Sequence, residues 1–155
     1  MIIWSGGQTG VDRAAWDAAI ACGLEQFGWV PKGRIAEDGR ISNRYSCKET
    51  NSTDYAVRTE KNLREADATL IVAFGELTGG TLLTEHLCKR FKRPLLVIDL
   101  DAGPEEEYFR RTMEFLRSNA PNSLNVAGPR SSSRPDIYDR AYAFLTRLFR
   151  ELKGA

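Results

Sequence analysis

The sequence has few of the residues from which disulfide frameworks, metal centres and histidine-dependent active sites are built. Its 155 residues include three cysteines and a single histidine. Because Cys22, Cys47 and Cys88 are scattered and form no CxxC pair, we expect reduced thiols in a cytoplasmic protein. His86 alone disfavours a histidine-rich metal site, and its position inside a predicted helix disfavours a Ser-His-Asp triad. We therefore predict no metal ligands.

The sequence also lacks an excess of either charge and has no long hydrophobic run. Lysine and arginine number 22 and aspartate and glutamate 21, a net charge of +1. This balance gives no general attraction to nucleic acid or to an anionic membrane, so we expect neither as a partner. The chain has no apolar run long enough for a membrane helix, and the composition of its first residues leads us to expect no signal peptide. An anionic ligand would therefore need a local site.

What the sequence does contain is a regular alternation of predicted strands and helices. The strands are predicted at 1–4, 26–30, 68–74, 94–100 and 123–128. The helices are predicted at 11–22, 54–66, 81–91, 104–117 and 137–152, and a long loop at 31–53. The continuous apolar runs at 68–74 and 94–100 are typical of strands buried on both faces of a parallel sheet. We predict a single α/β domain over 1–155, a Rossmann-like three-layer sandwich with a largely parallel sheet of about five strands.

Two glycine-rich loops follow predicted strands and lead directly into helices. The first is Ser5–Gly10 (SGGQTG) and the second is Thr78–Thr81 (TGGT). Ligands of open parallel sheets bind at the carboxyl ends of the strands, and backbone N–H groups at a helix N-terminus favour anions there. The pair therefore predicts a site for an anionic group, with plain strand–helix turns as the alternative explanation of the glycines.

The first loop does not match the standard nucleotide-binding patterns. It has no Walker A lysine, and Ser5 stands where GxGxxG requires its first glycine. The second predicted strand ends in the basic residues Lys32 and Arg34, where an NAD site has an acid for the ribose. These features disfavour NAD and favour a phosphorylated or otherwise anionic small molecule.

The predicted ligand-binding residues lie in these loops and at the other strand ends. They are Ser5, Gly6, Gly7, Gln8, Thr9, Gly10, Asp12, Lys32, Arg34, Thr78, Gly79, Gly80, Thr81 and Arg130. The glycine loops would contact phosphate, and the basic side chains would supply countercharge. Asp12 is either a charge that stabilises the helix N-terminus or a contact to a ribose or a metal.

Five stretches together resemble one protein family. They are SGGQTGVDRAAWDAA, WVPKGRIAEDG, RTEKNL, TLIVAFGELTGGT and LNVAGPR, and the resemblance as a whole runs from about residue 3 to about residue 140. They resemble the candidate molybdenum carrier family, the circularly permuted YpsA-like branch of the SLOG superfamily of Rossmann-like proteins. The resemblance implies a binding protein for a nucleotide or nucleotide-like ligand. The molybdenum cofactor, a pterin with a phosphate, is the ligand that the family name suggests. The resemblance also implies self-association as a homodimer or higher oligomer.

A more distant resemblance, to the cytokinin-activating LOG enzymes, bears on catalysis. Those enzymes hydrolyse the N-glycosidic bond of nucleoside monophosphates with an arginine and a glutamate. Arg58 stands eight residues before Ala66-Asp67, in register with that arginine, which implies a phosphate contact. Glu85 falls one residue later than the family glutamate, a rotation of about 100° on a helix. The alternatives to a carrier are thus a nucleotide N-glycosidase that uses Arg58 and Glu85, or a nucleotide sensor domain.

Overall fold

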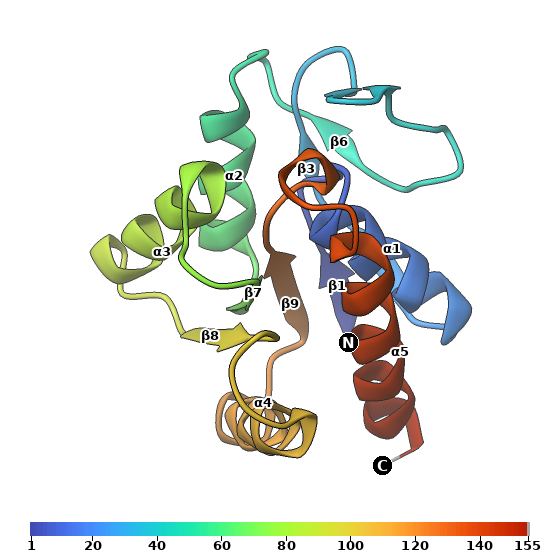
Figure 1. Cartoon of the computed structure of the whole chain (residues 1–155). Coiled ribbons are helices and arrows are strands. Elements are labelled where there is room, and N and C mark those ends of the chain that lie inside the picture. Colours follow the sequence, from blue (N-terminus) through green and yellow to red (C-terminus); the bar gives the residue numbers. More distant parts are fainter. Residues whose placement is uncertain (155) are drawn as a thin grey trace.

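Five parallel strands form the central sheet of the protein, seen here in a computed structural model that describes residues 1–154 (Figure 1). They are β1 (Ile2–Trp4), β2 (Glu25–Phe27), β7 (Ala68–Ala73), β8 (Leu95–Asp99) and β9 (Ser123–Ala127). Their order in the sheet is β2-β1-β9-β7-β8, and each neighbouring pair is parallel. The α/β fold and the parallel sheet that the sequence predicts are confirmed.

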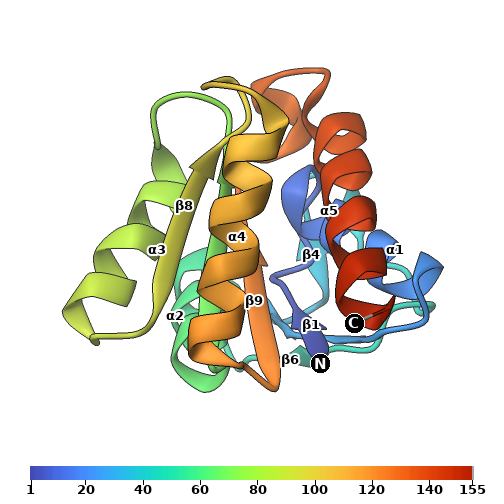
Figure 2. The same cartoon turned by 90° about the horizontal axis from the view of Figure 1, so that it is seen from below.

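Helices cover both faces of this sheet. They are α1 (Val11–Ala21), α2 (Tyr55–Glu65), α3 (Gly79–Arg90), α4 (Glu105–Asn119) and α5 (Ile137–Gly154), with a short 3-10 helix η1 (Ser131–Ser133). Helices α1, α4 and α5 share one apolar core with the sheet, while α2 and α3 lie on the other face (Figure 2). Strand β7 is buried throughout because both of its faces are covered. The arrangement is a Rossmann-like three-layer sandwich.

The small residues of α1 determine how closely it packs. Ala14, Ala15, Ala18 and Ala19 are fully buried in the core shared with α5. An alanine face lets a helix approach its neighbours closely, which the spacing of these residues in the sequence predicts. The carboxyl end of β1 and the start of α1 are thereby fixed against the rest of the sheet.

The region from residue 26 to residue 53 differs from its prediction. The strand predicted at 26–30 is two strands, because β2 ends at Phe27 and the chain then leaves the sheet. At the break, a Cβ on Gly28 would lie only 1.8 Å from the carbonyl oxygen of Ser5, a contact that only glycine allows. The second piece, β3 (Trp29–Val30), pairs with β6 (Lys48–Glu49).

The stretch predicted as a loop at 31–53 is an ordered segment that leaves the central sheet and packs against α1. We refer to residues 31–53 as the excursion. It contains the hairpin of β4 (Ile35–Ala36) and β5 (Gly39–Arg40). A second apolar cluster anchors it, in which Ile41 and Tyr45 pack on Trp16 of α1. Sequence periodicity could not reveal these two-residue strands, because they depend on a side chain that lies far away in the sequence.

The order of the strands brings three loops to one edge of the sheet. Because β9 lies between β1 and β7, the segments that follow these three strands meet at their common carboxyl edge. Helix α3 begins at Gly79, two residues earlier than predicted, so both glycines of the second loop belong to its first turn. Among residues 1–154, no helix has the length and apolar character needed to cross a membrane.

Candidate ligand-binding cleft

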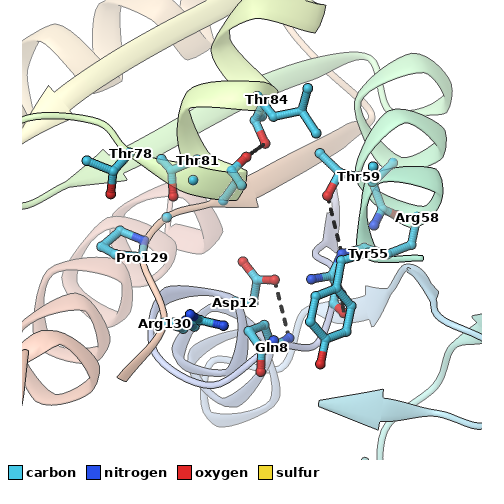
Figure 3. A pocket seen from close by; sticks show the side chains of 18 of the residues that line it. Gln8, Asp12, Tyr55, Arg58, Thr59, Thr78, Thr81, Thr84, Pro129 and Arg130 are labelled. Carbon is cyan, nitrogen blue, oxygen red and sulfur yellow. Dashed lines mark hydrogen bonds between the residues drawn. The ribbon is translucent and has the colours of Figure 1, made fainter. Parts of the chain in front are cut away.

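A cleft of about 360 Å³ opens where the loops after β1, β7 and β9 meet, between α2 and the start of α3 (Figure 3). This volume lies within the range of small-molecule sites. Nine of the predicted residues line it: Gly6, Gln8, Asp12, Arg58, Thr78, Gly79, Gly80, Thr81 and Arg130. The structure therefore brings both glycine loops and two of the predicted basic side chains to one cavity.

Arg58 is a buried cation in the wall of this cleft. Only 7% of the residue is exposed. Its Nη1 donates to the carbonyl oxygen of Gly6 at 2.5 Å, and its Nε donates to Oγ1 of Thr59 at 3.3 Å. Its guanidinium lies 5.0 Å from the ring centre of Tyr55, a cation–π contact that orients it.

No ion pair within the described residues neutralises Arg58. Burial lowers the pKa of its guanidinium, an effect that the charge of Asp12 partly opposes. A buried charge without a close counter-ion is costly, and an anion that enters the cleft would remove much of that cost. Arg58 is therefore well placed to bind an oxyanion.

The first turn of α3 lines the cleft opposite Arg58. The first backbone N–H groups of a helix have no partner within it. Here the hydrogen bonding begins with the N–H of Leu82, which donates to the carbonyl oxygen of Thr78 at 3.2 Å. The side chain of Thr78 does not cap the helix, and beyond the adjoining residues and backbone of the helix itself no atom lies within 4 Å of where a Cβ on Gly79 or Gly80 would stand. The turn is thus open to a ligand.

The first glycine loop is different, because the protein itself uses its donors. The N–H of Gly7 donates to Oγ of Ser5 at 3.3 Å, that of Gln8 to Oδ2 of Asp12 at 3.3 Å, and that of Thr9 to Oε1 of Gln8 at 3.0 Å. These three amides hold side chains of the same segment. An external anion would have to displace them.

In the first loop, the space where a glycine side chain would stand is occupied by atoms of other residues. A Cβ on Gly6 would lie 2.8 Å from Nε of Arg58, and one on Gly7 would lie 2.7 Å from the ring of Trp16. A Cβ on Gly10 would lie 2.4 Å from the carbonyl oxygen of Pro129. These three glycines permit close packing of the cleft wall, as the interpretation of the loop as a tight strand–helix turn predicts.

Asp12 is the acidic residue of the cleft. It is 7% exposed and projects from the start of α1 toward the space below α3 (Figure 3). Burial raises the pKa of its carboxyl group to about 6, against the opposing effects of Arg58, Arg13 and the loop N–H groups of Gln8 and Gly6. Asp12 can therefore gain or lose a proton close to neutral pH.

Several predicted residues lie outside the cleft lining. The hydroxyl of Ser5 donates to the carbonyl oxygen of Asp12 at 2.9 Å, and that of Thr9 donates to Glu37. Lys32 is exposed on the excursion. The guanidinium of Arg34 donates to the carbonyl oxygens of Ile41, Ser42 and Tyr45. These hydrogen bonds tie the excursion together, and Arg34 is not among the residues that line the cleft.

Glu85 also lies away from the lining. Its carboxylate forms an ion pair with Lys89 at 3.5 Å, one turn further along α3. This placement follows from the one-residue offset in the sequence, which turns the side chain away from the cleft. Glu85, the carboxylate that the N-glycosidase alternative uses, is therefore not among the residues that line the cleft.

Sequence reasoning missed part of the lining. The polar or aromatic members are Tyr55, Thr59, Asn62, Thr84, Asn125 and Ser133. Tyr55 and Asn62 lie three residues before and four residues after Arg58 on α2, so helical spacing from that residue could have identified them. Asn125 is a buried amide inside a central strand, an exception to the apolar pattern that is a signal in itself.

Comparison with known proteins identifies relatives of this chain. The sequence profile described as the circularly permutated YpsA SLOG family matches residues 3–149. A crystal structure from Syntrophus aciditrophicus, described as a candidate molybdenum carrier protein, is similar with a TM-score of 0.91 and 44% sequence identity, over 96% of this chain and 93% of that one. Comparison with curated proteins gives no match.

Proposed function

The chain belongs to the circularly permuted YpsA branch of the SLOG family, and on that premise we propose that it is a carrier or binding protein for a phosphorylated, nucleotide-like small molecule. The observation that carries the proposal is the position of Arg58, a buried cation that lines the same cleft as the open first turn of α3. A guanidinium and free helical N–H groups are the donors that phosphate prefers.

In this proposal the phosphate binds between Arg58 and the N–H groups of Gly79, Gly80 and Thr81. Arg130, half-exposed in the cleft lining, adds charge near the mouth. The aromatic part of the ligand would stack on Tyr55, which lines the same cleft beside Arg58. Trp4 and Trp29 are not required for this stacking, because they pack against Phe27 instead.

The molybdenum cofactor is the ligand that the name of the Syntrophus aciditrophicus protein favours. It combines a phosphate with a flat pterin ring, so one molecule would satisfy both Arg58 and Tyr55. A nucleotide sensor would use the same cleft with a different ligand. We keep the cytoplasmic location and homo-oligomeric assembly that the sequence suggests as parts of the proposal.

Thermal unfolding with and without ligands tests this function. The panel is AMP, ADP-ribose, molybdopterin and molybdate, applied to the wild type and to Arg58→Ala. A ligand present at about 100 times its Kd should stabilise the wild type by about 2.7 kcal/mol, a rise in Tm of several degrees. Arg58→Ala should lose most of that rise, because it removes the buried cation.

The matched control for this experiment is Arg64→Ala, two turns along the same helix. Arg64 is exposed and forms an ion pair with Glu60 rather than lining the cleft. It should keep the full response to ligand. If no member of the panel stabilises the wild type, or if Arg58→Ala responds as the wild type does, the proposed function is wrong.

A further inference from the structure

The anion site of the proposed function contains a carboxylate, that of Asp12, as well as the cation of Arg58. Asp12 lines the same cleft as Arg58 and the first turn of α3. One of its oxygens, Oδ2, is held by the N–H of Gln8 at 3.3 Å, which fixes the carboxylate against the loop. An oxyanion bound by Arg58 and α3 would therefore meet a fixed hydrogen-bond acceptor that carries the same charge.

Only some oxyanions can make a favourable contact with such an acceptor. Monohydrogen phosphate and singly protonated phosphate esters carry an acidic hydrogen that can be donated to a carboxylate. Sulfate and molybdate at neutral pH carry none, so their oxygens would face the carboxylate of Asp12 with two acceptors and no proton between them. The acceptor thus separates anions of equal charge and similar size.

Building on the proposed function, we infer that Asp12 is a specificity-determining residue, through which the cleft selects phosphate groups that carry a proton over sulfate and free molybdate. A hydrogen bond to a charged group, compared with an unpaired acceptor, corresponds to a preference of about tenfold to a hundredfold. The ligand class that follows is a phosphate group that keeps a proton when it is bound: inorganic monohydrogen phosphate, or a phosphate monoester bound in its singly protonated form, since the second pKa of such an ester is about 6.

The charged groups around Asp12 determine the pH at which this selection operates. Arg130, from the segment after β9, lines the same cleft. Arg58 from α2 and Arg13 from α1 lower the pKa of Asp12, as do the loop N–H groups of Gln8 and Gly6. Together with burial they leave the pKa of Asp12 at about 6. At about pH 7.5 the carboxylate is thus ionised and acts as an acceptor, and below about pH 6 it becomes a donor.

The experiment compares inorganic phosphate, sulfate and molybdate as probes, by the rise in Tm at about pH 7.5 and constant ionic strength. The proteins are the wild type, Asp12→Asn and the control Asp38→Asn, whose acid pairs with Arg13 outside the cleft lining. We expect the wild type and Asp38→Asn to bind phosphate at least about tenfold more tightly than sulfate or molybdate. Asp12→Asn, whose amide can donate, should lose that preference.

A second measurement needs no variant, in case Asp12→Asn fails to fold. The affinity of the wild type for sulfate should increase about tenfold from about pH 7.5 to about pH 5, because Asp12 takes up a proton and becomes a donor. Sulfate or molybdate binding as tightly as phosphate at about pH 7.5 would overturn the inference and leave the proposed function intact. The inference would also be overturned if Asp12→Asn kept the preference for phosphate, or if the affinity of the wild type for sulfate did not change between about pH 7.5 and about pH 5. If neither these anions nor AMP binds, both proposals fall.

Discussion

The two glycine loops have the same setting in the sequence and opposite roles in the structure. Both follow a parallel strand and lead into a helix, and both reach the same cleft. In the first loop, the amides of Gly7, Gln8 and Thr9 donate to the protein's own side chains, and other atoms of the protein lie close to where Cβ atoms on its glycines would be. At Gly79 and Gly80 the space is empty. A glycine in such a loop therefore serves packing or a ligand according to what lies beside it in space.

The largest effect should come from Gly10→Ala, which disrupts the packing of the first loop, Ser5–Gly10. We call this loop closed because its amides and glycines are already in contact with other atoms of the protein, and we call the loop at Gly79 and Gly80 open. Gly10 has φ 79° and ψ −129°, a conformation that alanine rarely adopts. Its methyl group would also lie 2.4 Å from the carbonyl oxygen of Pro129. We expect the free energy of unfolding to fall by about 3 kcal/mol or more and the Tm to fall by roughly 6–12 °C. Calorimetry measures it, and an unchanged Tm would contradict the close packing.

Gly80→Ala sharpens the comparison by making the same change in the open loop. No atom lies within 4 Å of the added methyl group, and alanine is the better helix former. Stability should stay the same or rise by up to about 1 kcal/mol. Affinity for phosphate should nevertheless fall at least about tenfold, because the methyl group occupies the approach to the helix amides. Unchanged binding in a stable variant would place the phosphate elsewhere.

The carboxylate that occupies the first loop should leave a signature in the pH dependence of stability. Burial raises the pKa of Asp12 from 3.8 to about 6, so between these values the folded protein binds more protons than the unfolded chain. The stabilisation from protonated Asp12 is therefore present at low pH and lost as the pH rises through about 6. Relative to Asp12→Asn, the wild type should gain about 1 kcal/mol on going from about pH 7 to about pH 5.

Urea unfolding of both proteins at the two pH values measures this difference. The comparison with Asp12→Asn removes the contributions of all other titrating groups that the two proteins share. A wild type that loses stability relative to the variant on acidification would mean that the folded state favours the ionised carboxylate, contrary to its burial.

The smallest effect should come from Glu37→Gln, which loosens the closed loop from outside. Glu37 lies in the turn of the β4–β5 hairpin and accepts hydrogen bonds from Thr9 and from the N–H (3.1 Å) and hydroxyl (2.6 Å) of Ser132. Hydrogen bonds to a neutral glutamine side chain are weaker than those to a carboxylate. We therefore expect the free energy of unfolding to fall by about 1 kcal/mol and the backbone N–H groups of the hairpin to exchange their hydrogens faster. The exposed residue Glu151 gives the control, Glu151→Gln, which should leave both unchanged.

The sequence predicts the parts of this fold that depend on local pattern. The apolar run at 68–74 becomes the fully buried β7, and the segments after the strands supply eight of the nine predicted members of the cleft lining. Which strands are neighbours depends on long-range contacts, so the central place of β9 could not be read from its residues. The same limit applies to Arg34, whose charge is used by three carbonyl groups of the excursion.

The roles of the glycines and of Asp12 were also beyond local pattern. Trp16 occupies the space beside Gly7, and Pro129 occupies the space beside Gly10. The sequence of the loop itself gives no sign of either contact. Asp12 stands at a helix start, where an acid usually only stabilises the helix. Its burial in a cleft that also contains Arg58 gives it a different chemistry.

The most direct test of the central claim, that an oxyanion binds at the open loop, is a titration with inorganic phosphate followed by ¹H–¹⁵N NMR. The backbone amides of Gly79, Gly80 and Thr81 should shift progressively, while those of Gly7, Gln8 and Thr9 stay nearly constant, because they already donate to acceptors within the protein. Shifts confined to the Ser5–Gly10 amides, with those of α3 unmoved, would contradict the account.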